Sequence, residues 1–249
     1  MSDKARDSKS KTQNPRFRDL GLGIDSSLDI RSSSFDEWLL WQLADSAFPT
    51  GGFAHSNGLE AAWQQGEVGG RAELLAFLEA SLKQVGHASL PFMLAAFDTP
   101  EALDQINAYY DAFTSNQVAN RASRAQGRAF LAAVERIFEP EIGSRKSELK
   151  CAHFAPVFGV CLRELKVARE TAARMFLFHH LRAVLAAAVR LNIVGPMEAQ
   201  TLLRKLSPMA EVILQACDRL TLEQAAQTSP LLELWQGAQD RLYSRLFQS

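Results

Sequence analysis

Serine and histidine residues of the kind used in nucleophilic catalysis lie close together near the start of the apolar part of the chain. Ser46, His55 and Ser56 have suitable side chains, because a histidine can accept the proton of a serine hydroxyl. Adjacent side chains such as those of His55 and Ser56 do not generally face each other, and no third group that would orient the histidine can be identified. The pattern therefore does not predict a catalytic site.

Histidine and cysteine could also ligate a metal. Cys151 and His153 are close in sequence, whereas His179 and His180 are adjacent and would point to different sides of a helix. None of these spacings matches a closed structural metal site. No metal ligand is assigned: His55 and His153 are possible metal contacts, and for both the favoured interpretation is packing or a role at the start of a helix.

A proline–glycine–glycine loop interrupts an apolar helical pattern, which then restarts. Pro49 cannot continue the preceding helix, and Gly51 and Gly52 permit a positive φ or the close approach of another chain segment. Ser56 is expected to cap the next helix, with Glu60 in its first turn, where a negative charge is favourable. The pattern predicts a kinked helix–loop–helix, whereas a phosphate-binding loop would have another layout and usually a lysine.

Apolar residues recur every three or four positions after residue 34, which is the spacing of one helix face. The clearest runs are Leu74–Val85, Leu103–Phe113, Leu177–Leu191, Met209–Leu220 and Leu231–Leu242. Turn signals separate the runs at Gly69-Gly70, Thr99-Pro100, 139–147, Gly195-Pro196, Ser207-Pro208 and Ser229-Pro230. The sequence therefore predicts an all-α fold, with about ten helices and short loops forming one globular domain over residues 35–249.

Residues 1–34 have a different composition, dominated by Lys, Arg, Asp and Ser. Such a segment buries too little apolar area to offset the entropy lost on ordering, so a disordered N-terminal tail is predicted. Its acidic residues argue against a transit peptide.

Charge and composition narrow the class of partner. The 249 residues carry a net charge of -1, which disfavours a broad basic surface and hence nucleic acid or anionic membrane as partners. The longest apolar-rich run, Met175–Leu191, contains two histidines and two arginines and is too polar to span a membrane. Three cysteines fit a reducing compartment, and no secretory signal follows Met1, so the cytoplasm is the expected location.

Hydrogen-bonding side chains gather further along the chain, at Asn120, Arg121, Ser123 and Gln126. They would form either a satisfied polar network between helices or a partner interface, and the residues alone favour neither. Arg190 and Gln200 are expected to tie one helix to the next across Gly195.

Four segments, in the same order along the chain, resemble the urease accessory protein UreF family. Ala44–Glu60 looks like its Asp-Ser, Pro-x-Gly-Gly-Phe, His-Ser and Gly-Leu-Glu pattern, with Thr50 where an aliphatic residue is more usual. Asn120–Gly127, His153–Gly159 and Ala188–Gln200 resemble three further elements of the family. The matches span roughly residues 38–205, almost all of the globular part.

The resemblance and the C-terminal aromatic residues together supply the candidate partner-binding or structural residues. They are Asp45, Ser46, Pro49, Gly51, Gly52, His55, Ser56, Gly58, Glu60, Asn120, Arg121, Ser123, Gln126, Gly127, His153, Arg190, Gln200, Trp235 and Tyr243. The apolar segment 231–249 should dock on its own domain or on another protein. The resemblance favours the partner UreD/UreH.

The resemblance implies a non-enzymatic, homodimeric chaperone of nickel insertion. Such a protein bridges UreD/UreH and the GTPase UreG on apo-urease and modulates UreG. It has no cofactor of its own, since nickel is handled transiently by the complex and GTP is bound by UreG. The alternative is a helical enzyme or small-ligand-binding protein that uses His55 and His153, and it would act without any partner.

Overall fold

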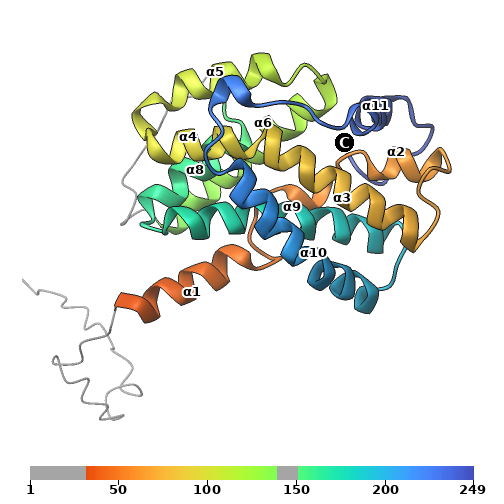
Figure 1. Ribbon diagram of the computed structural model, residues 1–249, viewed down its shortest axis with the longest axis horizontal. Coiled ribbons are helices and arrows are strands. Elements are labelled where there is room, and N and C mark those ends of the chain that lie inside the picture. Colours follow the sequence, from red (N-terminus) through yellow and green to blue (C-terminus); the bar gives the residue numbers. More distant parts are fainter. Residues whose placement is uncertain (1–31, 139–150) are drawn as a thin grey trace, which may run out of the picture. The chain divides into compact units, whose positions relative to one another are not determined.

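The computed structural model describes residues 32–138 and 151–249, and every regular element in these two stretches is helical (Figure 1). The predicted all-α fold is confirmed: the described residues form ten α-helices and four short 3-10 helices, with no strand among them. The tail up to residue 31 and the turn predicted at 139–147 lie outside the described residues.

The helices follow the apolar runs of the sequence. They are α1 (Ser32–Ala44), α2 (Leu59–Gln64), α3 (Arg71–Ala88), α4 (Leu90–Asp98), α5 (Leu103–Phe113), α6 (Gln117–Ile137), α8 (Phe154–Glu164), α9 (Arg169–Arg190), α10 (Pro196–Cys217) and α11 (Pro230–Ala238). The chain divides into two units, Met1–Leu39 and Leu40–Ser249. In the first unit the described part is the beginning of α1, which starts at Ser32, inside the segment expected to be a tail.

Helix α8 packs extensively against α4 and α6 in the second unit. Its aromatic side chains join a ring cluster: Phe158 stacks on Phe130 of α6 at 5.2 Å between ring centroids and meets Phe176 of α9 at 5.6 Å. Two glycines allow the backbones to come this close. A Cβ at Gly159 would meet the carbonyl oxygen of Met93, and one at Gly127 the carbonyl of the residue that precedes His153, far inside van der Waals contact.

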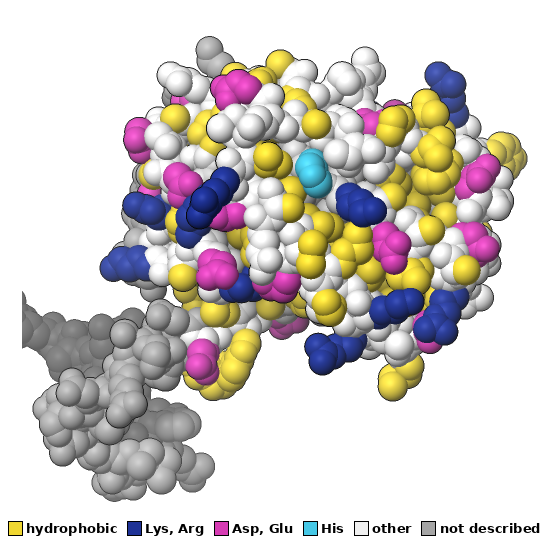
Figure 2. All heavy atoms as spheres, in the orientation of Figure 1, with side chains coloured by type: hydrophobic (Ala, Val, Ile, Leu, Met, Phe, Trp, Pro, Cys, Tyr) yellow, Lys and Arg dark blue, Asp and Glu magenta, His cyan; other side chains and the backbone are white. Residues whose placement is uncertain are grey.

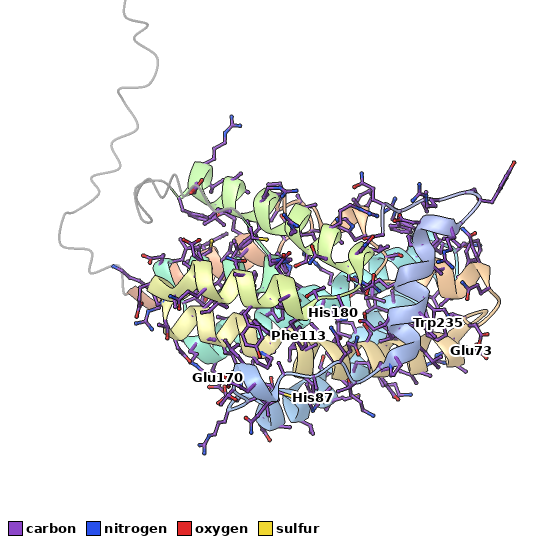
Figure 3. The ribbon with its side chains drawn as sticks, turned by 90° about the horizontal axis from the view of Figure 1, so that it is seen from above. Glu73, His87, Phe113, Glu170, His180 and Trp235 are labelled. Atoms are coloured by element: carbon purple, nitrogen blue, oxygen red, sulfur yellow. The ribbon has the colours of Figure 1, made fainter. Side chains whose placement is uncertain are left out.

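Helix α9 is long and apolar enough to cross a membrane by length and composition, yet most of its apolar window is buried within the fold. It contacts α3, α4, α8 and α10, as the core helix of a globular protein does. Figure 3 shows one of its polar residues, His180, in the interior between the helices.

The break expected at Ser207-Pro208 is wrong, because α10 continues from Pro196 to Cys217 with Pro208 inside it. Proline removes the amide that would bond to the carbonyl one turn earlier, which normally favours a helix boundary. The Ser207 hydroxyl donates to the Leu203 carbonyl at 2.9 Å, but the carbonyl that loses its amide donor at Pro208 is that of Arg204, so this bond does not replace it. Packing of α10 on α3 and α9 outweighs the local preference.

Candidate partner-binding site

The loop between α1 and α2 has a backbone that only glycine adopts without strain at two positions. Gly51 has φ = +71° before the short helix Gly52–Ala54, and Gly58 has φ = +85° before α2. The geometry of Gly52 needs no positive φ, and its amide donates to Thr50 Oγ1 at 3.3 Å. Ser56 Oγ accepts the Glu60 amide at 3.3 Å, although Gly58 occupies the N-cap position itself. The loop conformation is thus fixed by its two positive-φ glycines and by these hydrogen bonds.

The last residues of the chain form backbone hydrogen bonds with this loop. The Gln248 amide donates to the Ala54 carbonyl at 2.8 Å, and the Ser56 amide donates to the Ser249 carbonyl at 2.5 Å. Ser56 Oγ donates to that carbonyl as well, at 3.1 Å, and His55 Nδ1 lies 2.6 Å from Ser249 Oγ. The His-Ser pair therefore holds the chain's own C-terminal segment.

Glu60 is the centre of this attachment. The residue is 2% exposed, and its carboxylate accepts hydrogen bonds from the amides of Leu246 and Phe247, at 2.6 and 3.1 Å. Gln239 Nε2 donates to it at 2.6 Å and also reaches the Phe247 carbonyl at 3.3 Å. The predicted place of Glu60 in the first turn of α2 is correct, but its side chain serves residues 246 and 247. Gln239 was not singled out from the sequence, and only its position in a partly apolar helix end hinted at burial.

Arg190 joins α9 to both segments. Its guanidinium lies over the rings of Phe53 and Phe247, 3.8 and 4.2 Å from their centroids, and donates to the Phe53 carbonyl at 2.5 Å. The expected tie between Arg190 and Gln200 is wrong: Gln200 is exposed on α10, and no hydrogen bond joins the two among the described residues. Arg190 is the last residue of α9, and its guanidinium binds Phe53 in the loop instead.

Some candidate residues lie at the edge of this arrangement. Asp45 and Ser46 are exposed; Asp45 Oδ1 accepts the amide of Ala47 at 3.0 Å and the Ser46 hydroxyl at 3.4 Å. Pro49 is exposed as well. Ser46 therefore has an acidic neighbour as its hydrogen-bond partner, and the structure does not bring it together with His55.

A second polar cluster fastens the start of α8 to α5 and α6. Ser123 Oγ accepts the Phe154 amide at 3.2 Å and lies 3.2 Å from His153 Nδ1, while His153 Nε2 lies 3.0 Å from Asp111 Oδ1. Asn120 donates to Asp111 Oδ1 at 3.0 Å, and this bond contributes most to a lowered pKa of the aspartate. Burial lowers the pKa of His153, whose side chain is fully enclosed.

The two clusters are separate, but α6 reaches both. Arg121 forms an ion pair with Asp240 at 2.9 Å, next to the attached C-terminal segment, while Ser123, two residues on, belongs to the His153 cluster. Between the loop and the helices lies a cavity of about 460 Å³, with Gln126, Tyr110, His179 and His180 among its lining residues. The sequence left open whether these polar side chains form a network between helices or a partner interface. Asn120 and Ser123 belong to a network between helices.

Three histidines, His55, His179 and His180, are neutral at pH 7, and the last two line this cavity. Burial is the largest cause in each case and lowers the pKa of His55, His179 and His180 to about 4; the charges of Arg121 and Arg182 add to the effect on the first two. His180 Nε2 lies 2.6 Å from Ser81 Oγ.

We expect the protein to lose stability as the pH falls from 6.5 toward 5. In this window the unfolded chain binds protons at these histidines and the folded chain does not, so each removes about 1.4 kcal/mol per pH unit once fully coupled. Urea unfolding at pH 7, 6 and 5 measures the slope of the free energy of unfolding against pH. The variant His180→Gln, which keeps a hydrogen-bonding group toward Ser81, should show a shallower slope, and an unchanged slope would contradict the assignment.

The outer side of the C-terminal segment is apolar and exposed. Leu231 and Leu234 of α11 are 60% and 67% exposed, and Tyr243 and Leu246 are 104% and 52% exposed. Trp235, by contrast, stacks on Phe77 of α3 at 5.8 Å between ring centroids, near the end of α3 that carries Glu73 (Figure 3). Figure 2 shows hydrophobic side chains gathered over this end of the molecule, among charged ones. Tyr243 and Trp235 were both candidates from the sequence, but only Tyr243 is fully exposed to solvent. Trp235 packs against its own domain.

Comparison with known proteins gives consistent matches. A family model described as UreF matches residues 68–207. Urease accessory protein F of Arabidopsis thaliana is 39% identical over 228 residues, which are 88% of this chain and 95% of the relative. The protein of the same description from Oryza sativa subsp. indica is 39% identical over 223 residues, 84% of each chain. Urease accessory protein UreF of Mycobacterium tuberculosis is 31% identical over 215 residues, 85% of this chain and 98% of the relative.

Proposed function

Because the chain belongs to the UreF family of urease accessory proteins and so serves urease maturation, we propose that it acts as a scaffold and not as an enzyme. A homodimer of the chain bridges UreD/UreH and the GTPase UreG on apo-urease, in the cytoplasm. The complex delivers nickel to the urease active site, where a lysine is carbamylated. Nickel passes through the complex, GTP stays on UreG, and the scaffold needs no cofactor of its own.

The observation that carries the proposal is the attached C-terminal segment with its apolar outer side. Glu60, Ser56 and Arg190 hold residues 246–249, and α11 is held by the stacking of Trp235 on Phe77. Leu234 and Tyr243 are therefore exposed on a fixed support. Preformed aromatic and aliphatic groups favour protein binding, because little conformational entropy is lost when they are covered. We assign this surface to UreD/UreH.

Modulation of UreG would follow from differential binding. A scaffold changes the GTPase cycle only if it binds one nucleotide state of UreG more tightly than the other. The loop around Phe53, which is 73% exposed and supported from beneath by Arg190, is a suitable contact for such discrimination.

The alternative, an enzyme or small-ligand binder using His55 and His153, finds less support. The two histidines belong to separate clusters: His55 Nδ1 lies against Ser249 Oγ, and both ring nitrogens of His153 are engaged, by Ser123 and Asp111. Substrate turnover by the isolated protein would favour this alternative.

The proposal is tested by co-purification of the tagged full chain with UreD/UreH and UreG from cells that express the urease genes. Wild type should retain both partners. Leu234→Asp should reduce capture of UreD/UreH at least tenfold, because it places a charge within the apolar surface, with thermal unfolding unchanged. The matched control Met197→Asp changes an 83% exposed apolar residue on α10 and should keep capture.

If wild type retains neither partner, the scaffold proposal fails. If both aspartate variants capture UreD/UreH as wild type does, the assignment of the α11 surface is wrong.

A further inference from the structure

Three potential metal ligands converge where α5 ends and α8 begins. Asp111 lies in the last turn of α5, and Cys151 and His153 directly precede α8. The Asp111 Oδ1 atom lies 3.0 Å from His153 Nε2 and 3.5 Å from Cys151 Sγ, and the three ligand atoms all lie within 4.8 Å of one another. The proximity of Cys151 and His153 was visible in the sequence; the third donor comes from a different helix.

We infer that Asp111, Cys151 and His153 form a binding site for a borderline divalent cation, represented by Zn²⁺ or Ni²⁺. Imidazole, thiolate and carboxylate together suit such ions better than Mg²⁺ or Ca²⁺, which prefer oxygen alone. Metal–ligand bonds of about 2.0 Å to nitrogen or oxygen and about 2.3 Å to sulfur give tetrahedral edges of roughly 3.3 to 3.5 Å. Two of the observed separations are close to these edges.

His153 is held in the orientation that ligation needs. Its ring is fully buried, packs edge-on against Tyr110 at 5.0 Å between centroids, and has Ser123 Oγ 3.2 Å from Nδ1. A second hydrogen bond of this kind fixes the tautomer and direction of a ligating histidine in metalloproteins. Asn120, which donates to Asp111 Oδ1 at 3.0 Å, restrains the carboxylate in the same way.

The proton balance of binding is simple. Without metal, His153 Nε2–H donates to Asp111 and the Ser123 hydroxyl donates to Nδ1. With metal, Nε2 ligates, Nδ1–H donates to Ser123, and the ring stays neutral. The Cys151 thiol proton leaves to water, so one proton is released for each cation bound.

The site is open to solvent on one side. Asp111 is 40% exposed at its side chain and borders a surface basin of about 510 Å³ that is also lined by Arg121, Arg124 and Arg128. Among residues 32–138 and 151–249 the site has three protein ligands, which leaves a fourth position for an exchangeable ligand rather than the four protein ligands of a closed structural site. A bound cation would therefore be exchangeable.

Arg124 supplies a specific control. Its guanidinium lies 3.5 Å from Asp111 Oδ1 and so competes with a cation for the same oxygen. Arg124→Gln removes that positive charge and should tighten cation binding about threefold or more. A cluster with a purely structural role has no reason to respond in this way.

Titration of the reduced, metal-free full chain with Co²⁺ tests the site, because thiolate ligation gives a charge-transfer absorption in the near ultraviolet. We expect one equivalent of Co²⁺, displaced by Zn²⁺ or Ni²⁺. Cys151→Ser should lose the absorption and Asp111→Asn should bind at least tenfold more weakly, while Cys217→Ala, at a buried cysteine in α10, should behave as wild type.

Absence of a stoichiometric site in wild type would overturn the inference, as would an undiminished absorption in Cys151→Ser. The inference is independent of the proposed scaffold role, and its readout involves neither urease nor a partner protein. Failure of one is therefore distinguishable from failure of the other.

Discussion

Replacing Glu60 with alanine is expected to release residues 242–249 from the domain and to lower urease activation at least tenfold, while the helical core stays folded. The variant leaves the amides of Leu246 and Phe247 and the side chain of Gln239 without their acceptor. Each buried donor left unsatisfied costs about 1 to 3 kcal/mol, so undocking is the lower-energy outcome. The support beneath Tyr243 and Leu246 would then be lost.

Amide hydrogen exchange measures the release, since the Leu246, Phe247 and Gln248 amides should lose protection in Glu60→Ala. Urease activity after co-expression measures the functional loss. Glu73→Ala is the control, because Glu73 is an exposed glutamate in the first turn of α3 and should leave both readouts near wild type. Protected amides together with lost activation would show that Glu60 acts by another route.

Alanine in place of Gly159 is expected to destabilise the protein by about 3 kcal/mol or more, despite being the better helix former. A methyl group there would overlap the Met93 carbonyl of α4, and backbone atoms cannot move aside as a flexible side chain can. The helical preference of alanine over glycine, about 1 kcal/mol, has the opposite sign and is outweighed.

Urea unfolding of Gly159→Ala and Gly237→Ala separates these two effects. Gly237 also lies inside a helix, α11, but a Cβ there would meet only Asn116 Nδ2 at 3.7 Å, an ordinary contact. The control should be unchanged or slightly stabilised. Equal stability of the two variants would show that α4 and α8 can separate without cost.

The sequence predicted the helices better than it predicted the contacts between distant side chains. The helices α3, α5, α9 and α11 follow the apolar runs because periodicity reports which face is buried. Pro208 was misread because a local rule competes with the packing of a long helix on two others. Residues 1–34 could be separated from the domain by composition, but the described helix begins at Ser32.

At the site, too, the sequence identified important residues but not the residues that they contact. Glu60 was identified as important, yet its hydrogen bond to Leu246 joins positions 186 residues apart, which no local pattern reveals. Arg190 was expected to bond Gln200, a near neighbour in sequence, and instead lies between Phe53 and Phe247. Gln239 carried no signal beyond its place in the helix.

The attachment of residues 246–249 to the His55–Glu60 loop also has a consequence for synthesis of the protein. During translation the loop leaves the ribosome almost two hundred residues before the segment that satisfies it. Until then the buried carboxylate of Glu60 lacks the two backbone donors and Gln239. A chain released early, before residue 244, would therefore have the helical core without the finished loop. The surface that we propose as the docking site is therefore finished only after residues 246–249 have been made and have bonded to the loop.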